Sequence, residues 1–333
     1  MSHTAIFGSG SWGTAYATIV ADAGGSVSMY ARREEVARSI RESHRNPDYL
    51  PDLLLPDTIT ATDDPARAAA GADLVILAVP SQSLRDNLTI WAPHVPPGAV
   101  VVSLMKGIEV GTGLRMSQVI EQVGGIDSAR IVVVSGPNLS AEIAAKQPAA
   151  SVVAGTDHAA AAAVAEASAA SYFRPYTQTD VVGTEIGGAV KNVVALAVGM
   201  AEGLGYGDNT KSSIITRGLA ETARLGAALG ADPATLMGLA GVGDLIATCM
   251  SPLSRNHSVG VLLGQGLSVA QVVAIKHQTA EGLKSARSVV DLARSSGVDV
   301  PICEGVLAVV EGAMEPQRLA DVLMSRARKH ERH

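Results

Sequence analysis

The first half of the chain alternates short, continuously apolar runs with stretches in which apolar residues recur at helical spacing. Continuous apolar character is typical of strands that are buried on both faces of a parallel sheet. The strands predicted in this way are residues 4–8, 26–30, 74–79, 100–104 and 131–135. The helices predicted between them are residues 12–23, 33–43, 65–70 and 113–122. This alternation predicts an α/β fold with a doubly wound, mainly parallel sheet of the Rossmann type.

The pattern changes after about residue 182. Before that point, residues 151–154 and 172–176 predict further strands near a sheet edge, with a surface helix at 159–170. Beyond it, helical periodicity dominates and is interrupted by glycine and proline. We therefore expect a Rossmann domain over residues 1–182, an all-helical domain over 183–325 and a charged tail over 326–333.

Composition narrows the class of protein. The 333 residues fit two domains, and 47% apolar with 17% charged residues indicates a globular chain. A net charge of −6 argues against nucleic acid as a partner. Cys249 and Cys303 lack the spacing of a metal site, so we expect no metal and a reducing, cytoplasmic setting. The longest apolar helical run, residues 193–201, is too short for a membrane span, and none is expected.

A glycine-rich loop follows the first predicted strand and opens the first predicted helix. Its residues 8–13 read Gly-Ser-Gly-Ser-Trp-Gly, with the spacing G-x-G-x-x-G. Between a strand and a helix, this spacing is typical of dinucleotide binding. Gly8 permits the tight turn, Gly10 lets the backbone approach the pyrophosphate, and Gly13 lets the helix pack on the strand. Free N–H groups at the helix start face the anion, so we expect a nicotinamide dinucleotide here.

Arg32 and Arg33 follow the second predicted strand, where an NAD-preferring site usually carries a carboxylate. Two guanidinium groups suit the 2′-phosphate of NADP, because arginine presents a planar fork of donors. The alternative is that both arginines merely lie at a helix start, although cations in a first turn are unfavourable. We therefore expect NADP to be preferred and NAD to remain a possible cofactor.

Ligands of an open parallel sheet bind beyond the carboxyl ends of its strands. The fourth predicted strand is followed by Lys106 and Gly107, and the fifth by Gly136, Pro137 and Asn138. Lys106 is the only cation directly after the third, fourth and fifth strands, so it is a candidate ligand contact. The alternative is a solvated surface lysine.

The helical half carries charge in apolar surroundings. Lys191 lies in an otherwise apolar helix, with Gly187 and Gly188 one turn earlier on the same face. A desolvated lysine has a lowered pKa and exchanges a proton near neutral pH, whereas a lysine that extends to the surface does not. Asp244 lies in a glycine-flanked turn, where capping a helix is the ordinary role. The functional alternative is that Asp244 holds the Lys191 ammonium or a substrate hydroxyl in place.

A polar triplet precedes the predicted helical run 259–263. Its members are Ser254, Arg255 and Asn256. A hydroxyl, a guanidinium and an amide at a helix N-terminus are typical of a phosphate site. Together with Lys106 and Lys191, the triplet indicates a small phosphorylated substrate.

At these residues the chain resembles the bacterial NAD(P)-dependent sn-glycerol-3-phosphate dehydrogenases. The matching segments span nearly the whole chain in the family's order: 8–13 (GSGSWG), 104–109 (LMKGIE), 135–137 (SGP), 189–192 (AVKN), 239–249 (LAGVGDLIATC), 254–256 (SRN) and 280–282 (AEG). The resemblance implies a Rossmann domain followed by a helical domain like the C-terminal domain of 6-phosphogluconate dehydrogenase. It implies reversible reduction of dihydroxyacetone phosphate to sn-glycerol 3-phosphate, for glycerophospholipid synthesis, by a homodimer.

The resemblance also assigns roles to residues. Lys191 matches the proton donor and acceptor. The substrate positions are matched by Lys106, Gly136, Asn138, Lys191, Asp244, Ser254, Arg255 and Asn256. The cofactor positions are matched by Ser11, Trp12, Arg32, Arg33, Tyr49, Lys106, Ser140, Arg255, Thr279 and Glu281, beside Gly8, Gly10 and Gly13. One departure concerns residues 138–140, which read Asn-Leu-Ser where many members have Ser or Thr, an aromatic residue and Ala.

Two other readings stay open on the sequence. A dehydrogenase of the 3-hydroxyisobutyrate or ketopantoate type shares the two-domain pattern but acts on carboxylates and needs no Ser-Arg-Asn phosphate site. A non-catalytic NADP-binding regulator would bind the cofactor without assembling Lys106, Lys191 and Asp244.

Overall fold

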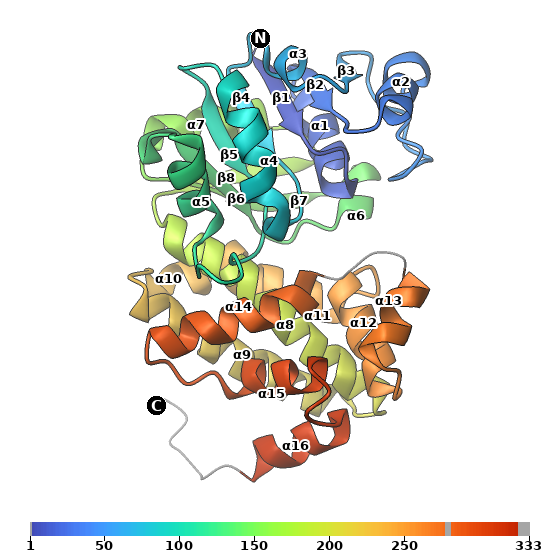
Figure 1. Cartoon of the computed structure of the whole chain (residues 1–333), viewed down its shortest axis with the longest axis vertical. Helices are drawn as coiled ribbons and strands as arrows, with labels where there is room; N and C mark the ends of the chain where they lie inside the picture. The colour runs from blue at the N-terminus through green and yellow to red at the C-terminus, as the bar shows by residue number, and fades with distance from the viewer. Residues whose placement is uncertain (1, 277–280, 326–333) are drawn as a thin grey trace.

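A computed structural model of the chain describes residues 2–276 and 281–325. It consists of a sheet with helices on both faces and, beside it, a body made of helices alone (Figure 1). The sheet is formed by the first half of the chain and the helical body by the second half. The α/β class and the all-helical second half are therefore confirmed.

The sheet has eight strands in the order β3-β2-β1-β4-β5-β6-β7-β8. Strands β1 to β6 are parallel, β7 is antiparallel to β6, and β8 is parallel to β7. The strands are β1 His3–Phe7, β2 Ser26–Tyr30, β3 Ile59–Thr62, β4 Leu74–Leu77, β5 Val100–Ser103, β6 Ile131–Ser135, β7 Ala149–Gly155 and β8 Phe173–Gln178. The order 3-2-1-4-5-6 is that of dinucleotide-binding Rossmann folds, with β7 and β8 added at one edge.

Helices cover both faces of this sheet. One face packs against α1, α2, α6 and α7, and the other packs against α3, α4 and α5. Their bounds are α1 Ser11–Asp22, α2 Glu34–Ser43, α3 Pro65–Ala69, α4 Leu84–Trp91, α5 Met116–Gly124, α6 Ser140–Ala144 and α7 His158–Ala167, with short 3-10 turns η1 Ser81–Ser83, η2 Ala92–His94 and η3 Ser128–Arg130. Strands β1, β4, β5 and β6 are therefore buried on both faces, as their continuous apolar runs predicted. In β2 only every second residue is fully buried, and β8 is largely exposed.

One strand and two helices of the first half escaped the sequence prediction. Strand β3 has only four residues, two of them threonine, and lies at the edge of the sheet. Helix α4 carries Asp86 and Asn87 in its third and fourth positions of eight, which obscured its helical spacing. Helix α6 has only five residues. All three elements are short, and packing against the rest of the domain stabilises them.

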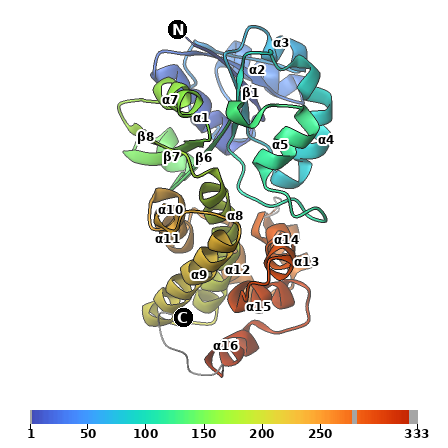
Figure 2. The same cartoon turned by 90° about the vertical axis from the view of Figure 1, so that its left-hand side faces the viewer.

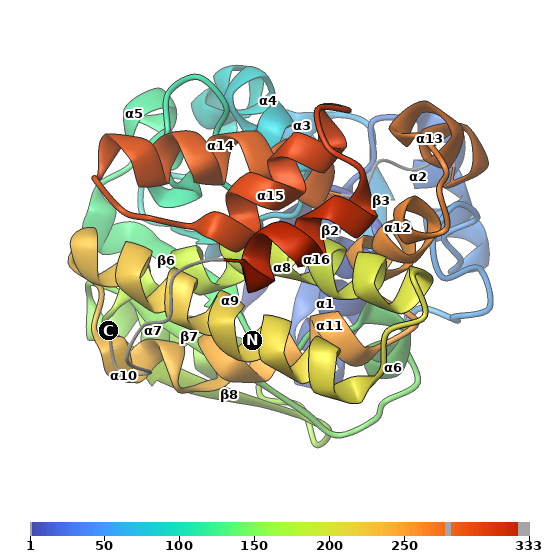
Figure 3. The ribbon, with the colours of Figure 1, turned by 90° about the horizontal axis from the view of Figure 1, so that it is seen from below.

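Helix α8 (Val181–Gly203) lies at the centre of the helical body. Helices α9 and α15 flank it, and α11, α12 and α14 also pack against it (Figures 2 and 3). The remaining bounds are α9 Asp208–Ala228, α10 Pro233–Leu236, a π-helical turn η4 Leu239–Gly243, α11 Asp244–Met250, α12 Arg255–Gly264, α13 Val269–Lys276, α14 Glu281–Ser295, α15 Pro301–Val310 and α16 Pro316–Met324. The change of pattern at residue 182 falls in the first turn of α8, and we propose that α8 opens the second domain.

The longest apolar helix is longer than the sequence analysis indicated. The apolar run 193–201 is part of a 23-residue helix, α8, which is long and apolar enough to cross a bilayer. However, 94% of its most apolar window is buried inside the protein. A second apolar stretch, Pro233–Met250, passes the same test, but α10, η4 and α11 divide it into short pieces. Helix α8 is therefore explained as the core helix of a helical domain.

Helices α8 and α12 approach each other through glycines. A Cβ added at Gly199 would lie 2.2 Å from the carbonyl oxygen of His257, and one added at Gly260 would lie 2.3 Å from that of Leu196. Gly203 and Gly264 repeat this contact one turn further along the two helices. Because the backbones of α8 and α12 are in direct contact here, the two helices hold a fixed relative position. This contact ties the start of α12 to the middle of α8.

Replacing Gly260 by alanine is expected to lower the free energy of unfolding by about 1–3 kcal/mol, because a methyl group would have to displace backbone atoms. Denaturant unfolding followed by circular dichroism measures the change. Gly98→Ala is the matched control, since nothing lies within 4 Å of a Cβ at that position. Equal unfolding free energies for the two variants would contradict the close contact of α8 and α12.

Candidate functional site

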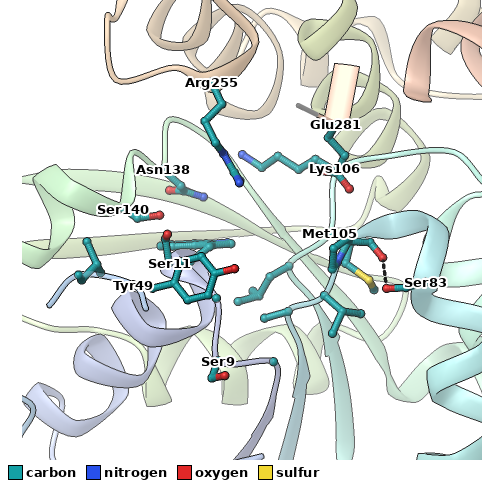
Figure 4. A pocket seen from close by; sticks show the side chains of 18 of the residues that line it. Ser9, Ser11, Tyr49, Ser83, Met105, Lys106, Asn138, Ser140, Arg255 and Glu281 are labelled. Carbon is teal, nitrogen blue, oxygen red and sulfur yellow. Dashed lines mark hydrogen bonds between the residues drawn. The ribbon is translucent and has the colours of Figure 1, made fainter. Parts of the chain in front are cut away.

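A cavity of about 890 Å³ lies between the carboxyl ends of the strands and the helical domain. Figure 4 shows Ser11 and Tyr49 approaching it from the Rossmann side and Arg255 reaching down from the helical side. The predicted residues that line it are Gly8, Gly10, Ser11, Trp12, Arg32, Arg33, Tyr49, Lys106, Asn138, Ser140, Lys191, Ser254, Arg255, Asn256 and Glu281. Of the other predicted residues, Thr279 falls outside the part of the chain that the structure describes. Gly13, Gly136 and Asp244 lie behind the lining and support it.

The glycine loop has the geometry that a bound pyrophosphate requires. Gly8 has φ +123°, and a Cβ there would lie 2.4 Å from the carbonyl oxygen of Ala78. A Cβ at Gly13 would lie 2.1 Å from the oxygen of Gly8, so α1 packs directly on the loop. At Gly10, the residue before α1, nothing lies within 4 Å of a Cβ, and the backbone is open to the cavity. The loop therefore fits a dinucleotide, and each glycine meets the requirement predicted for it.

Arg32 and Arg33 lie between β2 and α2. The expectation that they would place cations in the first turn of a helix is wrong. Arg33 is the residue before α2, and the first turn contains Glu34 and Glu35, so no cation opposes the helix dipole. The guanidinium of Arg33 is already ion-paired with Asp48, and Glu35 lies 3.6 Å away. Asp48 also lines the cavity and was not predicted from the sequence.

Asn46 is a further residue that the sequence analysis missed. It is fully buried, and its amide nitrogen donates to the carbonyl oxygen of Ser9 and to Thr14 Oγ1, both at 2.8 Å. Its side-chain oxygen accepts the backbone N–H groups of Asp48 and Tyr49 at 3.2 and 3.3 Å. One asparagine thus joins the segment that carries Asp48 and Tyr49 to the glycine loop. The position before a proline gives no sequence signal for this role.

Two lysines share one buried carboxylate on the helical side of the cavity. Lys191 Nζ donates to Asp244 Oδ1 at 2.5 Å and to Thr248 Oγ1 at 2.6 Å. Lys106 Nζ donates to Asp244 Oδ2 at 2.6 Å and to the carbonyl oxygen of Gly136 at 2.8 Å. Asp244 is only 1% exposed, so the two ammonium groups hold it from both sides. Its carboxylate does not cap α11, and the capping alternative is therefore wrong.

The electrostatics of this cluster favour an anionic or polarised ligand. Two ammonium groups against one carboxylate leave a net positive charge beside the cavity. The pKa of the Lys106 ammonium is lowered to about 8, because burial and, to a smaller extent, the Lys191 charge outweigh the opposing effect of the Asp244 charge. The surface-lysine alternative for Lys106 is wrong, because its side chain is only 13% exposed. Lys191 is 7% exposed, which also excludes extension of its amine to the surface.

The side-chain amides of Asn256 and Asn192 connect the start of α12 to α8, next to the lysine cluster. Asn256 donates to Asn192 Oδ1 at 2.8 Å and accepts the backbone N–H of Gly282 at 2.9 Å. Asn192 lies next to Lys191 in α8 and was missed as a site residue. Ser254 Oγ accepts the backbone N–H of His257, so the serine caps α12. The Ser-Arg-Asn triplet thus opens α12 at the cavity, with Arg255 extending into it (Figure 4).

The loop after β6 contributes an acceptor without a partner. Asn138 donates to Ser151 Oγ at 3.2 Å, while its buried Oδ1 has no hydrogen-bond partner among the described residues. An orphaned buried oxygen of this kind is costly unless a ligand donates to it. Ser140 begins α6 beside it and lines the same wall of the cavity. Across the cavity, Glu281 accepts the backbone N–H of Ser81 at 2.8 Å and joins the two domains.

Two family models match the chain. The model of the NAD-dependent glycerol-3-phosphate dehydrogenase N-terminus matches residues 3–161, and that of the C-terminus matches residues 180–321. The chain belongs to the NAD-dependent glycerol-3-phosphate dehydrogenase family. The predicted family is therefore confirmed, and each half of the cavity comes from one of the two family domains.

Individual relatives agree with this assignment. The chain is 58% identical over 328 residues to the glycerol-3-phosphate dehydrogenase [NAD(P)+] of Streptomyces griseus, covering 98% of each chain. It is 55% identical over 334 residues to that of Thermobifida fusca, covering 100% of this chain and 99% of the relative. A crystal structure of glycerol-3-phosphate dehydrogenase from Coxiella burnetii superposes with a TM-score of 0.93 at 31% identity, covering 98% and 99%.

The likeness to ketopantoate reductases is much weaker. The ketopantoate reductase from Ralstonia eutropha superposes on this chain with a TM-score of 0.60 at 18% identity. That likeness shows a common fold and nothing about the reaction of this chain. The family assignment therefore favours the glycerol-3-phosphate dehydrogenases over the ketopantoate type.

Proposed function

We propose that this protein catalyses the reversible, NAD(P)H-dependent reduction of dihydroxyacetone phosphate to sn-glycerol 3-phosphate, for glycerophospholipid synthesis. The observation that carries the proposal is the Lys106–Asp244–Lys191 cluster, which faces the same cavity as the glycine loop. A binding protein has no need for two buried ammonium groups on one carboxylate. A reductase needs them, because negative charge develops on the substrate oxygen as the carbonyl is reduced.

The bound nicotinamide supplies the hydride, and the chain's own residues supply the rest. Lys191 donates a proton from Nζ to the oxygen that develops at C2 of the substrate, and takes it back in the reverse direction. Asp244 and Thr248 hold that amine in place through their 2.5 and 2.6 Å contacts. Lys106 adds a second positive charge near the oxygen.

The substrate phosphate is assigned to the start of α12. Arg255 supplies the charge, Ser254 and Asn256 flank it, and the helix N-terminus adds its partial positive charge. Asn138, with its unpartnered Oδ1, is assigned to a substrate hydroxyl, and the carbonyl of Gly136 holds Lys106. In this proposal the phosphate and the reacting carbonyl lie on the helical side of the cavity.

The cofactor is assigned to the Rossmann side. The pyrophosphate would lie on Gly8, Gly10, Ser11, Trp12 and Gly13, the adenosine ribose beside Arg32 and Arg33, and the remainder along Tyr49, Lys106, Ser140, Arg255, Thr279 and Glu281. We assign NADP as the preferred cofactor and NAD as the second, in a cytoplasmic homodimer. Both cysteines are buried free thiols, which suits a reducing compartment.

The test is to follow oxidation of NADPH and of NADH separately at 340 nm, with dihydroxyacetone phosphate as substrate. We expect turnover with both, and more efficient turnover with NADPH. Ketopantoate and methylmalonate semialdehyde, the oxidised form of 3-hydroxyisobutyrate, serve as controls for the alternative that acts on carboxylate-bearing substrates and should give none. Absence of turnover despite nucleotide binding would favour the non-catalytic regulator and overturn the proposal.

A further inference from the structure

The adenosine end of the cavity holds a carboxylate as well as the two arginines. Arg32, Arg33 and Asp48 all line it, together with Tyr30 and Tyr49. Asp48 is ion-paired with Arg33, and its side chain is 35% exposed, so it remains accessible from the cavity. The carboxylate that NAD-preferring folds usually place directly after the second strand is therefore supplied here by a later segment.

Asp48 is held in this position by the glycine loop itself. The oxygen of the buried Asn46 side chain accepts the backbone N–H of Asp48, while the nitrogen donates to the backbone oxygen of Ser9. The backbone of Asp48 is thus anchored to the glycine loop, and its carboxylate is held by the ion pair with Arg33. A nucleotide seated on the glycine loop would therefore have this carboxylate nearby.

We propose that Asp48 is a specificity-determining residue for the 2′ position of the adenosine ribose. The inference rests on the proposed use of NAD(P)H and adds how the chain balances the two cofactors. Asp48 neutralises Arg33 and would repel the 2′-phosphate of NADP(H), while it offers an acceptor to the 2′-hydroxyl of NAD(H). Arg32 has no ion pair with any described residue and supplies the opposing attraction for the phosphate.

This balance explains how one site accommodates both cofactors. With NADP(H), Arg33 would exchange its ion pair with Asp48 for one with the phosphate. With NAD(H), the ion pair between Arg33 and Asp48 persists and the carboxylate faces a neutral hydroxyl. Discrimination between the two nucleotides therefore depends on the charge of Asp48 and not only on the arginines.

The test measures nucleotide binding without substrate, by quenching of intrinsic tryptophan fluorescence and by calorimetry, for NADPH and NADH separately. For Asp48→Asn we expect tighter binding of NADPH, weaker binding of NADH and a change of about tenfold in the ratio of their dissociation constants. Adenosine 2′,5′-bisphosphate and 5′-AMP, as probes of the adenosine end alone, should show the same change. The shift should shrink at high salt, because exposed charges are screened.

Asp52→Asn is the matched control, since it removes the same charge from an exposed position in the same segment. An unchanged ratio for Asp48→Asn, or an equal change for Asp52→Asn, would overturn the inference. Equal weakening of both nucleotides would also overturn it, because that outcome indicates a purely structural role. Should wild-type protein bind both nucleotides but fail to reduce dihydroxyacetone phosphate, the proposed function fails while the ratio measurement still decides the role of Asp48.

Discussion

Lys191→Ala is expected to lower kcat for dihydroxyacetone phosphate reduction by about 10² to 10⁴-fold, the usual contribution of a positioned general acid. KM and the dissociation constant of NADPH should change little, because the phosphate and the nucleotide are assigned to other residues. Asp244 keeps Lys106 as a partner in this variant, so the buried carboxylate is not left unpaired. Steady-state kinetics with a separate nucleotide titration measure both parts of the expectation.

Lys191→Arg separates proton transfer from charge. Arginine keeps the positive charge but does not release a proton in a protein, so its kcat should also remain low. Lys146→Ala, whose side chain is 56% exposed and paired with Asp22, is the control and should be close to wild type. Near-normal turnover of Lys191→Ala would refute the assignment, and near-normal turnover of Lys191→Arg would show that charge alone is needed.

The second large effect is expected for Asp244→Asn. The amide has the shape of the carboxylate but not its charge, so two buried ammonium groups lose their common partner. Breaking a buried ion pair on one side typically costs about 3–5 kcal/mol of stability. Asp208→Asn is the matched control, because Asp208 pairs with Lys211 while being 85% exposed, and such surface pairs contribute about 0–1 kcal/mol.

The pH dependence of Asp244→Asn gives a second readout. The pKa of Lys106 is about 8, and the charge of Asp244 raises it against the effect of burial. Removing that charge should lower this pKa, so the fall of kcat/KM on the alkaline side should begin at lower pH than in the wild type. An alkaline limb at the same pH in both proteins would contradict the role of Asp244 in keeping Lys106 protonated.

The sequence alone predicted the features that depend on residues close together in the chain. Strands β1, β4, β5 and β6 were predictable because they are buried on both faces and have continuous apolar runs. The glycine loop was predictable because Gly8 and Gly13 have no space for a Cβ, so the turn requires glycine at both positions. Lys191 was recognisable because a charge within an apolar helix is costly and needs a reason.

What depends on distant partners was not predictable. The expected contact of Asp244 with the Lys191 ammonium is confirmed, but Lys106 lies 138 residues from Asp244, and nothing near either residue shows that Lys106 shares the same carboxylate. Asn46 and Asp48 act through contacts with the glycine loop and Arg33, which only the folded chain brings together. Strand β3 and helix α4 were missed for the related reason that their stability comes from packing and not from their own pattern.

Helix α8 has a consequence for the synthesis of this protein. It leaves the ribosome as a 23-residue apolar segment, yet α12, α14 and α15, which cover it, follow over roughly the next 100 residues. At about 5–20 residues per second, the last of these helices follows roughly 5–20 s after α8. During that interval the Rossmann domain is complete, while the helix that carries Lys191 still lacks part of the cover for its apolar surface. We therefore expect the helix of the proposed catalytic lysine to need protection from aggregation while the helical domain is being synthesised.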